Sequence, residues 1–176
     1  QPADPTLAFL SALIEEFSDE WGNKWMFHFR WAREVDQVST AKRLVGEMMA
    51  GASEEAMAPM VAQIQERMVG RIGVVGSNET TAPIIEASFQ GGVDLLEAHL
   101  EDRNWLFGGR PCFADFGLAG QLHAALCDPT AGSILKQKAP AVCAWIDRFL
   151  DPAASGDFET WASLAPTLEP FLSGPV

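Results

Sequence analysis

Basic residues are scarce in this sequence, and long apolar runs are absent. Twelve Lys and Arg stand against 24 Asp and Glu, so the formal net charge is −12. Such a charge repels polyphosphate, which argues against nucleic acid and anionic membrane surfaces as partners. No apolar run is long enough to cross a bilayer, and the first residues lack the basic and then apolar pattern of a signal peptide. We therefore expect a cytoplasmic protein that does not associate with membranes.

Cysteine and histidine are equally sparse, with three of each. Three cysteines are too few for a disulfide framework and fit a reducing compartment. The histidines share no metal-ligand spacing with the cysteines, so we predict no metal site. No nucleophile, base and orienting acid occur in an arrangement typical of a hydrolase. The functional information must therefore lie elsewhere in the chain.

Helical periodicity dominates what is present. Apolar residues recur at intervals of three or four along most of the 176 residues, and no segment alternates with the period of two that a strand requires. The sequence contains no repeat of 20 to 50 residues, which argues against a helical solenoid. With 48% hydrophobic residues the chain can bury a sizeable core. The sequence predicts a single all-α domain over residues 1–176, folded as a helical bundle.

Proline, glycine and capping residues set the expected boundaries of the helices. Asp4-Pro5 opens the first helix, which Gly22 is expected to bend, and the Gly91-Gly92 pair is expected to allow a neighbouring helix close approach. The glycine-rich segment 70–76 is interpreted as an interhelical connection, because its spacing does not match a nucleotide-binding loop. Helices are expected over 6–33, 40–49, 53–68, 81–102 and 113–126, then from Asp128-Pro129 and from Ala139-Pro140, with short helical pieces over 157–171.

The segment 105–118, WLFGGRPCFADFGL, carries the most specific signal. It is similar to the glutathione transferase C-terminal domain, in which a loop reading Leu-x-Gly-x-x-x-(Ser/Thr)-x-Ala-Asp leads into a buried central helix. Asp115 is the acid of the capping box, and Cys112 replaces the usual Ser or Thr. Because a thiol accepts hydrogen bonds weakly, Asp115 is expected to provide most of the cap. A Cys112 thiol with a lowered pKa, and hence an oxidation site, is the alternative interpretation.

Other segments extend the resemblance over most of the chain. Residues 2–5 look like the end of the family's interdomain linker, and the helices over 6–33 and 81–102 look like the pair that forms the dimer face and one wall of the substrate pocket. The segment from Pro140 to Trp145 is similar to the family's late helix. Residues 35–80 are longer than the family's usual connection, and the resemblance implies no role for them.

The resemblance implies a chemistry that this chain does not complete alone. Family members join the glutathione thiolate to an electrophilic carbon, or use it for reduction or isomerisation, and their thiol-activating residue lies in a thioredoxin-like domain that this sequence lacks. The chain has no tyrosine at all. We expect no cofactor in this chain, with glutathione as co-substrate if an upstream domain is present. The expected partners are a hydrophobic electrophile, that thioredoxin-like domain and a second copy in a homodimer.

The aromatic stretch over residues 21–31 is the candidate wall for the hydrophobic co-substrate. Large rings with a few polar groups suit flat apolar ligands, and Trp21, Trp25, His28 and Phe29 are the candidate residues. An aromatic stripe at helical spacing is also typical of a core, and that alternative stays open. Two further functions remain open for the whole domain, namely a non-catalytic protein-interaction module and a stand-alone binder of hydrophobic small molecules.

Overall fold

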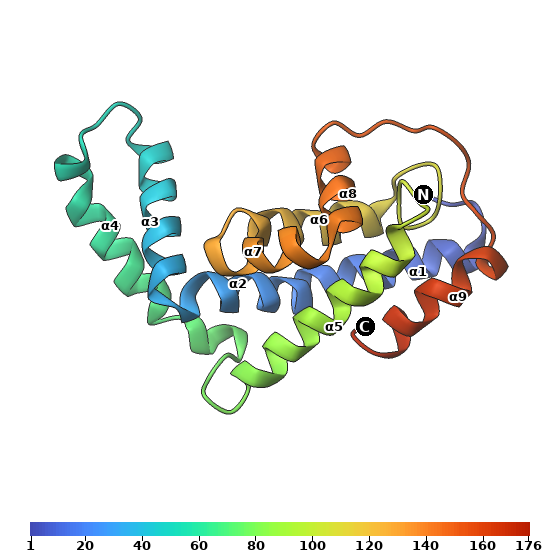
Figure 1. The fold of residues 1–176 in the computed structure, drawn as a ribbon, viewed down its shortest axis with the longest axis horizontal. Helices are drawn as coiled ribbons and strands as arrows, with labels where there is room; N and C mark the ends of the chain where they lie inside the picture. The colour runs from blue at the N-terminus through green and yellow to red at the C-terminus, as the bar shows by residue number, and fades with distance from the viewer.

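The computed structural model describes all 176 residues, which form nine α-helices and no β-strand. The all-α prediction is therefore confirmed. Helices α1 (Pro5–Phe17) and α2 (Asn23–Ala32) are joined by a π-helical turn over Ser18–Gly22 and form the long rod predicted over 6–33 (Figure 1). Asp4 caps the rod by accepting the Leu7 N–H at 3.0 Å. None of the helices combines the length and the apolar character needed to span a membrane.

Helix α6 (Phe113–Leu126) lies at the centre of the bundle. It packs against the rod on one side and against α7 (Pro129–Lys138) and α8 (Pro140–Leu150) on the other. The rod and α6 run in the same direction, because Ser11 accepts a hydrogen bond from the Ala114 N–H and, further along both helices, Gly22 faces Gln121. A helix surrounded in this way must be apolar on several faces. Its buried residues are Ala114, Asp115, Leu118, Ala119, Leu122 and Ala125.

Helix α5 (Ala82–Leu100) crosses the rod at a point where the two backbones approach closely. A Cβ atom at Gly92 would lie 2.6 Å from the Trp25 ring, whereas one at Gly91 would meet nothing within 4 Å. The expected close approach is therefore confirmed for Gly92 and does not involve Gly91. The fully buried indole of Trp25 occupies the space that the missing side chain leaves.

The last helix, α9 (Trp161–Ser173), packs beside α5 and α1 and corrects one prediction. The sequence predicts short helical pieces, but α9 is continuous through Pro166 and Pro170. Proline inside a helix removes a hydrogen bond and is unfavourable by itself. Burial of three apolar residues on one face offsets this cost. These residues are Leu164, Leu168 and Phe171.

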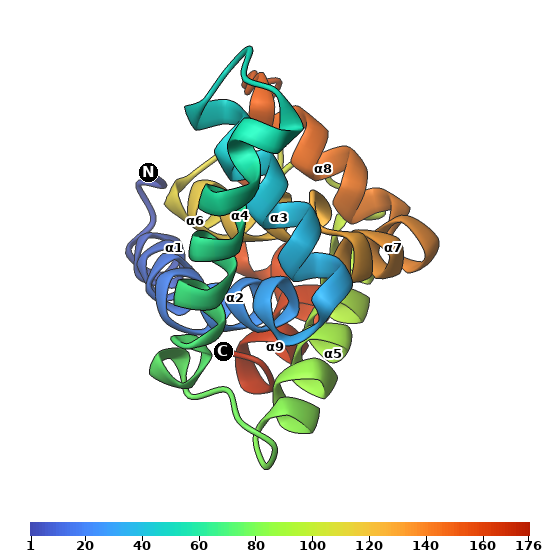
Figure 2. The same cartoon turned by 90° about the vertical axis from the view of Figure 1, so that its left-hand side faces the viewer.

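Helices α3 (Glu34–Met48) and α4 (Glu54–Val69) form a hairpin that projects from one end of the bundle (Figures 1 and 2). The prediction that α3 begins at residue 40 is wrong. Arg33, with φ −122° and ψ 138°, ends α2, and the new helix starts directly after it. Its first turns are polar apart from two valines, so periodicity alone does not reveal them. Ser53 caps α4 as predicted, accepting the Ala56 N–H at 3.3 Å.

Two helices begin at a proline and take their caps from a distant carboxylate. Glu97 on α5 accepts the Ala141 and Val142 N–H groups of α8, each at 3.0 Å. Asp36 on α3 accepts the Thr130 N–H of α7 at 2.7 Å. A carboxylate at a helix N-terminus satisfies free amides and interacts favourably with the helix dipole. These contacts hold α7 against α3 and α8 against α5.

Candidate functional site

Asp115 is fully buried at the first turn of α6 and accepts four hydrogen bonds. Its Oδ2 atom receives the Cys112 N–H at 2.9 Å and the Cys112 thiol at 3.3 Å. Its Oδ1 atom receives the Leu106 N–H at 2.8 Å and the Trp145 Nε1–H at 3.0 Å. Burial raises the pKa of Asp115, while these four donors act to lower it. The predicted cap is confirmed, and Asp115 also connects the 105–112 loop and α8 to the central helix.

Cys112 does not carry an activated thiol. Burial, followed by the neighbouring Asp115 charge, raises the pKa of Cys112 to about 12. The thiolate is the nucleophilic and readily oxidised form of cysteine, and it is not populated at such a pKa near neutral pH. The alternative interpretation of Cys112 as a low-pKa oxidation site is therefore wrong, because burial beside a carboxylate outweighs any effect of the helix N-terminus.

Three of the four predicted pocket residues lie in the core instead of lining a cavity. Trp25 and Phe29 are at most 1% exposed and both contact the ring of Phe89, at centroid distances of 5.9 and 4.7 Å. His28 is also 1% exposed. Side chains this deeply buried cannot touch a ligand in this conformation. The structure therefore favours the core alternative for Trp25, His28 and Phe29, and leaves Trp21 as the one candidate on a cavity.

Both ring nitrogens of His28 have partners inside the domain. Nδ1 lies 2.8 Å from Ser77 Oγ, and Nε2 donates to Glu86 Oε1 at 3.1 Å. Arg33 Nη2 donates to the same oxygen at 2.6 Å. Burial alone would raise the pKa of Glu86, but hydrogen bonds from His28 and Arg33 and the Arg33 charge hold it below its ordinary value. His28 thus connects the rod to α5 and to the segment before it.

Arg30 likewise makes its polar contacts within the domain. Its Nε donates to Asp128 Oδ2 at 2.7 Å, and its guanidinium also bonds the Ala124 carbonyl. The other oxygen of Asp128 accepts from Thr40 at 2.8 Å and from Arg43 at 2.7 Å. Asp128 is buried, so these charge-assisted bonds anchor the α3–α4 hairpin to the bundle.

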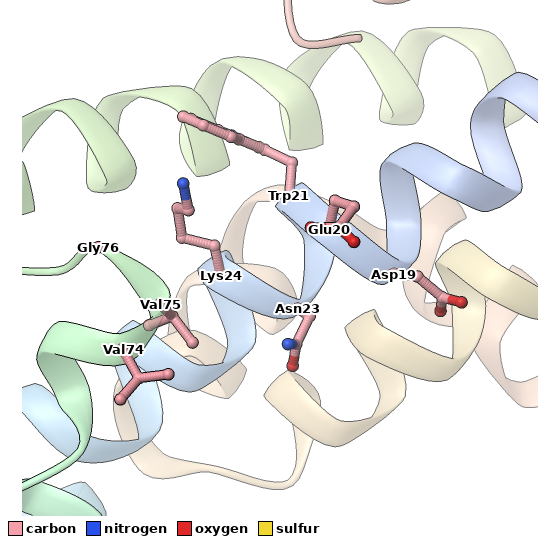
Figure 3. A pocket seen from close by; sticks show the side chains of 8 residues that line it. All are labelled: Asp19, Glu20, Trp21, Asn23, Lys24, Val74, Val75 and Gly76. Carbon is pink, nitrogen blue, oxygen red and sulfur yellow. The ribbon is translucent and has the colours of Figure 1, made fainter.

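Trp21 lines a cavity of about 540 Å³ where the π-helical turn meets the segment 74–76 (Figure 3). The turn carries Asp19, Glu20 and Trp21, and the next turn of the rod adds Asn23 and Lys24. The opposite wall, Val74–Gly76, includes the end of a 3₁₀ turn over Ile72–Val75. Local π-helical geometry re-aims side chains and frequently occurs at functional sites.

The position of Trp21 is determined by Ser88 on α5. The Nε1–H groups of Trp21 and Trp25 both donate to Ser88 Oγ, at 2.9 and 3.1 Å. The Ser88 hydroxyl therefore orients both indoles, although Trp25 lies in the core and Trp21 lines the cavity. The Trp21 ring is half-buried and also carries the Lys24 ammonium at 4.0 Å from its centroid.

Sequence reasoning missed Lys24 and the wall formed by residues 74–76. The segment 70–76 connects two helices, as predicted, but its apolar pattern does not indicate that it closes a cavity against the rod. Gly76 is the one signal that bears on this wall. Its φ of +76° belongs to the left-handed region, which a glycine adopts without strain. It ends the 3₁₀ turn and brings the chain close to the Lys24 ammonium.

Comparison with known proteins identifies the family. The profile described as glutathione S-transferase, C-terminal domain, matches residues 53–148. This range is more than half of the chain and contains the 105–118 segment, the central helix and the Pro140 helix. No curated protein and no solved structure shows significant similarity to the chain. The match agrees with the resemblance inferred from the capping segment, and with the buried cap and all-helical bundle seen in the structure. The chain belongs to the glutathione S-transferase C-terminal domain family.

Proposed function

We propose that this domain is the co-substrate-binding half of a cytoplasmic glutathione transferase-like protein, and that the Trp21 cavity receives the hydrophobic electrophile. The observation that carries the proposal is the cavity itself, which is walled by a half-buried indole and lies on the rod of a family member. Ligand sites are typically concave with aromatic walls, and here the Trp21 ring supplies such a wall beside four polar or charged side chains. The buried Cys112 thiol, with a pKa of about 12, cannot supply the reactive sulfur. Glutathione would therefore be activated by another domain.

An exposed aromatic surface supports a neighbouring domain as partner. Phe9 on α1 is 64% exposed, and Phe113 and Phe116 on α6 are 58% and 42% exposed. Helices α1 and α6 pack side by side, so these rings lie on adjacent elements. Exposed apolar patches on a soluble domain commonly mark an interaction surface. We assign this surface to the thioredoxin-like domain. Association of two copies as a homodimer is part of the same proposal.

The enzymatic proposal is tested on the parent protein that carries the residues upstream of Gln1. We expect it to bind glutathione and to conjugate 1-chloro-2,4-dinitrobenzene. Trp21→Leu removes the aromatic wall and should raise the KM for the electrophile about tenfold while the KM for glutathione stays unchanged. Trp161→Leu is the matched control, because Trp161 is also half-buried and does not line the cavity. A parent protein without glutathione binding or conjugation contradicts the enzyme, and equal effects of the two variants contradict the site.

The α3–α4 hairpin supports a second candidate function, a non-catalytic interaction module. A groove of about 380 Å³ lies along α4 and is lined partly by Met57, Ala58 and Val61. Methionine-bearing grooves adapt to varied partners. Under this alternative the parent protein binds no glutathione, and its binding partner is lost when Met57 is changed to Asp but not when Trp21 is changed to Leu.

A further inference from the structure

A second, smaller cavity lies next to the Trp21 cavity and shares part of its wall. The smaller one measures about 160 Å³ and extends toward Ile84 and Ile85 at the start of α5. Trp21, Lys24 and Gly76 line both spaces, so the two cavities are adjacent. A ligand longer than one ring that lies along Trp21 and Lys24 would therefore contact the lining of both.

The outer edges of the two cavities carry apolar side chains that solvent now covers. Val74 is 84% exposed and Ile84 is 59% exposed. A flat apolar ligand against Trp21 would remove these two aliphatic side chains from water, and such burial is favourable. The indole N–H of Trp21 is already bonded to Ser88, so this residue offers its ring rather than a hydrogen bond.

Lys24 is the polar group that selects among such ligands. It is half-buried over the Trp21 ring, and none of the six ion pairs in the domain includes it. The nearby Gly76 carbonyl already accepts the Thr81 hydroxyl at 2.6 Å. A partly desolvated ammonium without an anionic partner gains most from a ligand that brings one.

The two acids on the π-helical turn do not neutralise Lys24. Asp19 and Glu20 are both exposed, and neither forms an ion pair with it. Figure 3 shows the Lys24 ammonium beside the Trp21 ring, with Asp19 at the other end of the cavity. Exposed carboxylates that form no ion pair are screened by solvent and salt, whereas Lys24 is half-buried.

We propose that the two adjacent cavities together bind a flat aromatic molecule bearing an anionic group, with its ring system against Trp21 and Ile84 and its carboxylate or sulfonate on the Lys24 ammonium. This inference rests on the proposed function, because it names the class of co-substrate that the Trp21 cavity accepts. It adds that the electrophile, or its aromatic part, carries a negative charge.

The test compares three probes of one shape on the 176-residue domain, which has its own core of 29 buried residues. The probes are 2-naphthoate, neutral 2-naphthylmethanol and cationic 2-naphthylmethylammonium. Binding is followed by the shift of the Trp21 indole N–H resonance, assigned with Trp21→Phe. We expect naphthoate to bind about tenfold more tightly than the alcohol, because a charge-assisted hydrogen bond is added to the same apolar contact.

Lys24→Gln should abolish that preference by weakening the binding of naphthoate. Lys42→Gln removes the same charge from the α4 groove and should leave the preference intact. If the alcohol or the ammonium probe binds as tightly as naphthoate, or if Lys24→Gln leaves the preference unchanged, the anionic ligand class is overturned while the Trp21 pocket stands. If no probe shifts the Trp21 resonance, the pocket assignment fails, and the ligand class fails with it.

Discussion

Among single residues, Asp115 has the greatest concentration of polar contacts in the core. It joins a loop, the start of the central helix and the indole of α8 through four donors, all buried with it. Both oxygens of a carboxylate accept hydrogen bonds. In asparagine one of them is replaced by an N–H₂ group, which cannot accept from the two donors that face it. The geometry thus requires the acid and does not tolerate its closest isostere.

Asp115→Asn should therefore lower the free energy of unfolding by about 3 kcal/mol, because buried donors lose their acceptor. Urea denaturation monitored by circular dichroism measures the change. Asp157→Asn is the control, since the Asp157 side chain is 98% exposed and its ion pair spans 3.7 Å. A loss for Asp115→Asn no greater than that of the control would contradict the role of Asp115 as the central cap.

His99 provides a pH dependence that can be assigned a direction. It is fully buried, Nε2 donates to the Leu106 carbonyl at 2.7 Å, and Nδ1 lies 2.8 Å from the Thr167 hydroxyl. Burial is the main cause that lowers the pKa of His99 below its ordinary value of 6.5. Below that pH the unfolded chain binds a proton that the folded chain does not, so stability is present above pH 6.5 and falls as the pH decreases.

The comparison of wild type with His99→Gln measures this contribution. Between pH 7.5 and 5.5 the wild-type protein should lose stability at up to about 1.4 kcal/mol per pH unit from this group, and the variant should lose less. Urea midpoints at several pH values give the two slopes. Parallel slopes for the two proteins would show that His99 titrates alike in the folded and unfolded states.

Within the elements, the crossing of α5 and the rod depends on one of two adjacent glycines. Gly91→Ala places a methyl group in open space and should stabilise the protein by about 0.5 to 1 kcal/mol through helix propensity. Gly92→Ala has the same intrinsic benefit, but its methyl group would lie 2.6 Å from the buried Trp25 ring and should destabilise the protein overall by about 1 to 3 kcal/mol.

Thermal unfolding of the two alanine variants is the measurement, and each is the control for the other. Opposite shifts in Tm are expected from neighbouring positions of one helix. If both variants were stabilised, the packing of Trp25 against α5 would be looser than the structure shows.

In the whole molecule, stability is distributed unevenly between the bundle and the α3–α4 hairpin. Helix α6 contributes six buried residues, whereas α4 has none. Segments with few buried contacts open more readily than the core. Among the helices, exchange of backbone amide hydrogens should therefore be fastest in α4 and slowest in α6.

Asp128→Asn tests how the hairpin is anchored, because it weakens the bonds of Thr40 and Arg43 on α3 to the bundle. We expect exchange to become faster in α3 and α4 by about tenfold and to stay nearly unchanged in the second half of α5. Mass spectrometry of peptides covering these helices resolves the two regions. A uniform increase in exchange over the whole chain would instead mean that the hairpin and the bundle open as one unit.

The sequence was most informative where local patterns are strong. The rod over 6–33, the helix starts at Pro129 and Pro140 and the Asp115 cap follow from apolar periodicity, proline and capping chemistry, which act between residues close in the chain. The start of α3 is not predicted because its first turns are polar apart from two valines, so apolar periodicity does not reveal them. The continuity of α9 was missed because buried contacts outweigh two prolines.

For the candidate site, too, the sequence predicts the local pattern and the tertiary structure decides the rest. The aromatic stretch alone predicts that large rings gather on one helix, and this determines that the rod is rich in indoles. Only the tertiary structure decides which ring is core and which is wall, because that depends on Ser88, Gly92 and the segment 74–76. Apolar periodicity shows which side chains of one helix face the core. A cavity, in contrast, forms where the packing of neighbouring segments leaves space.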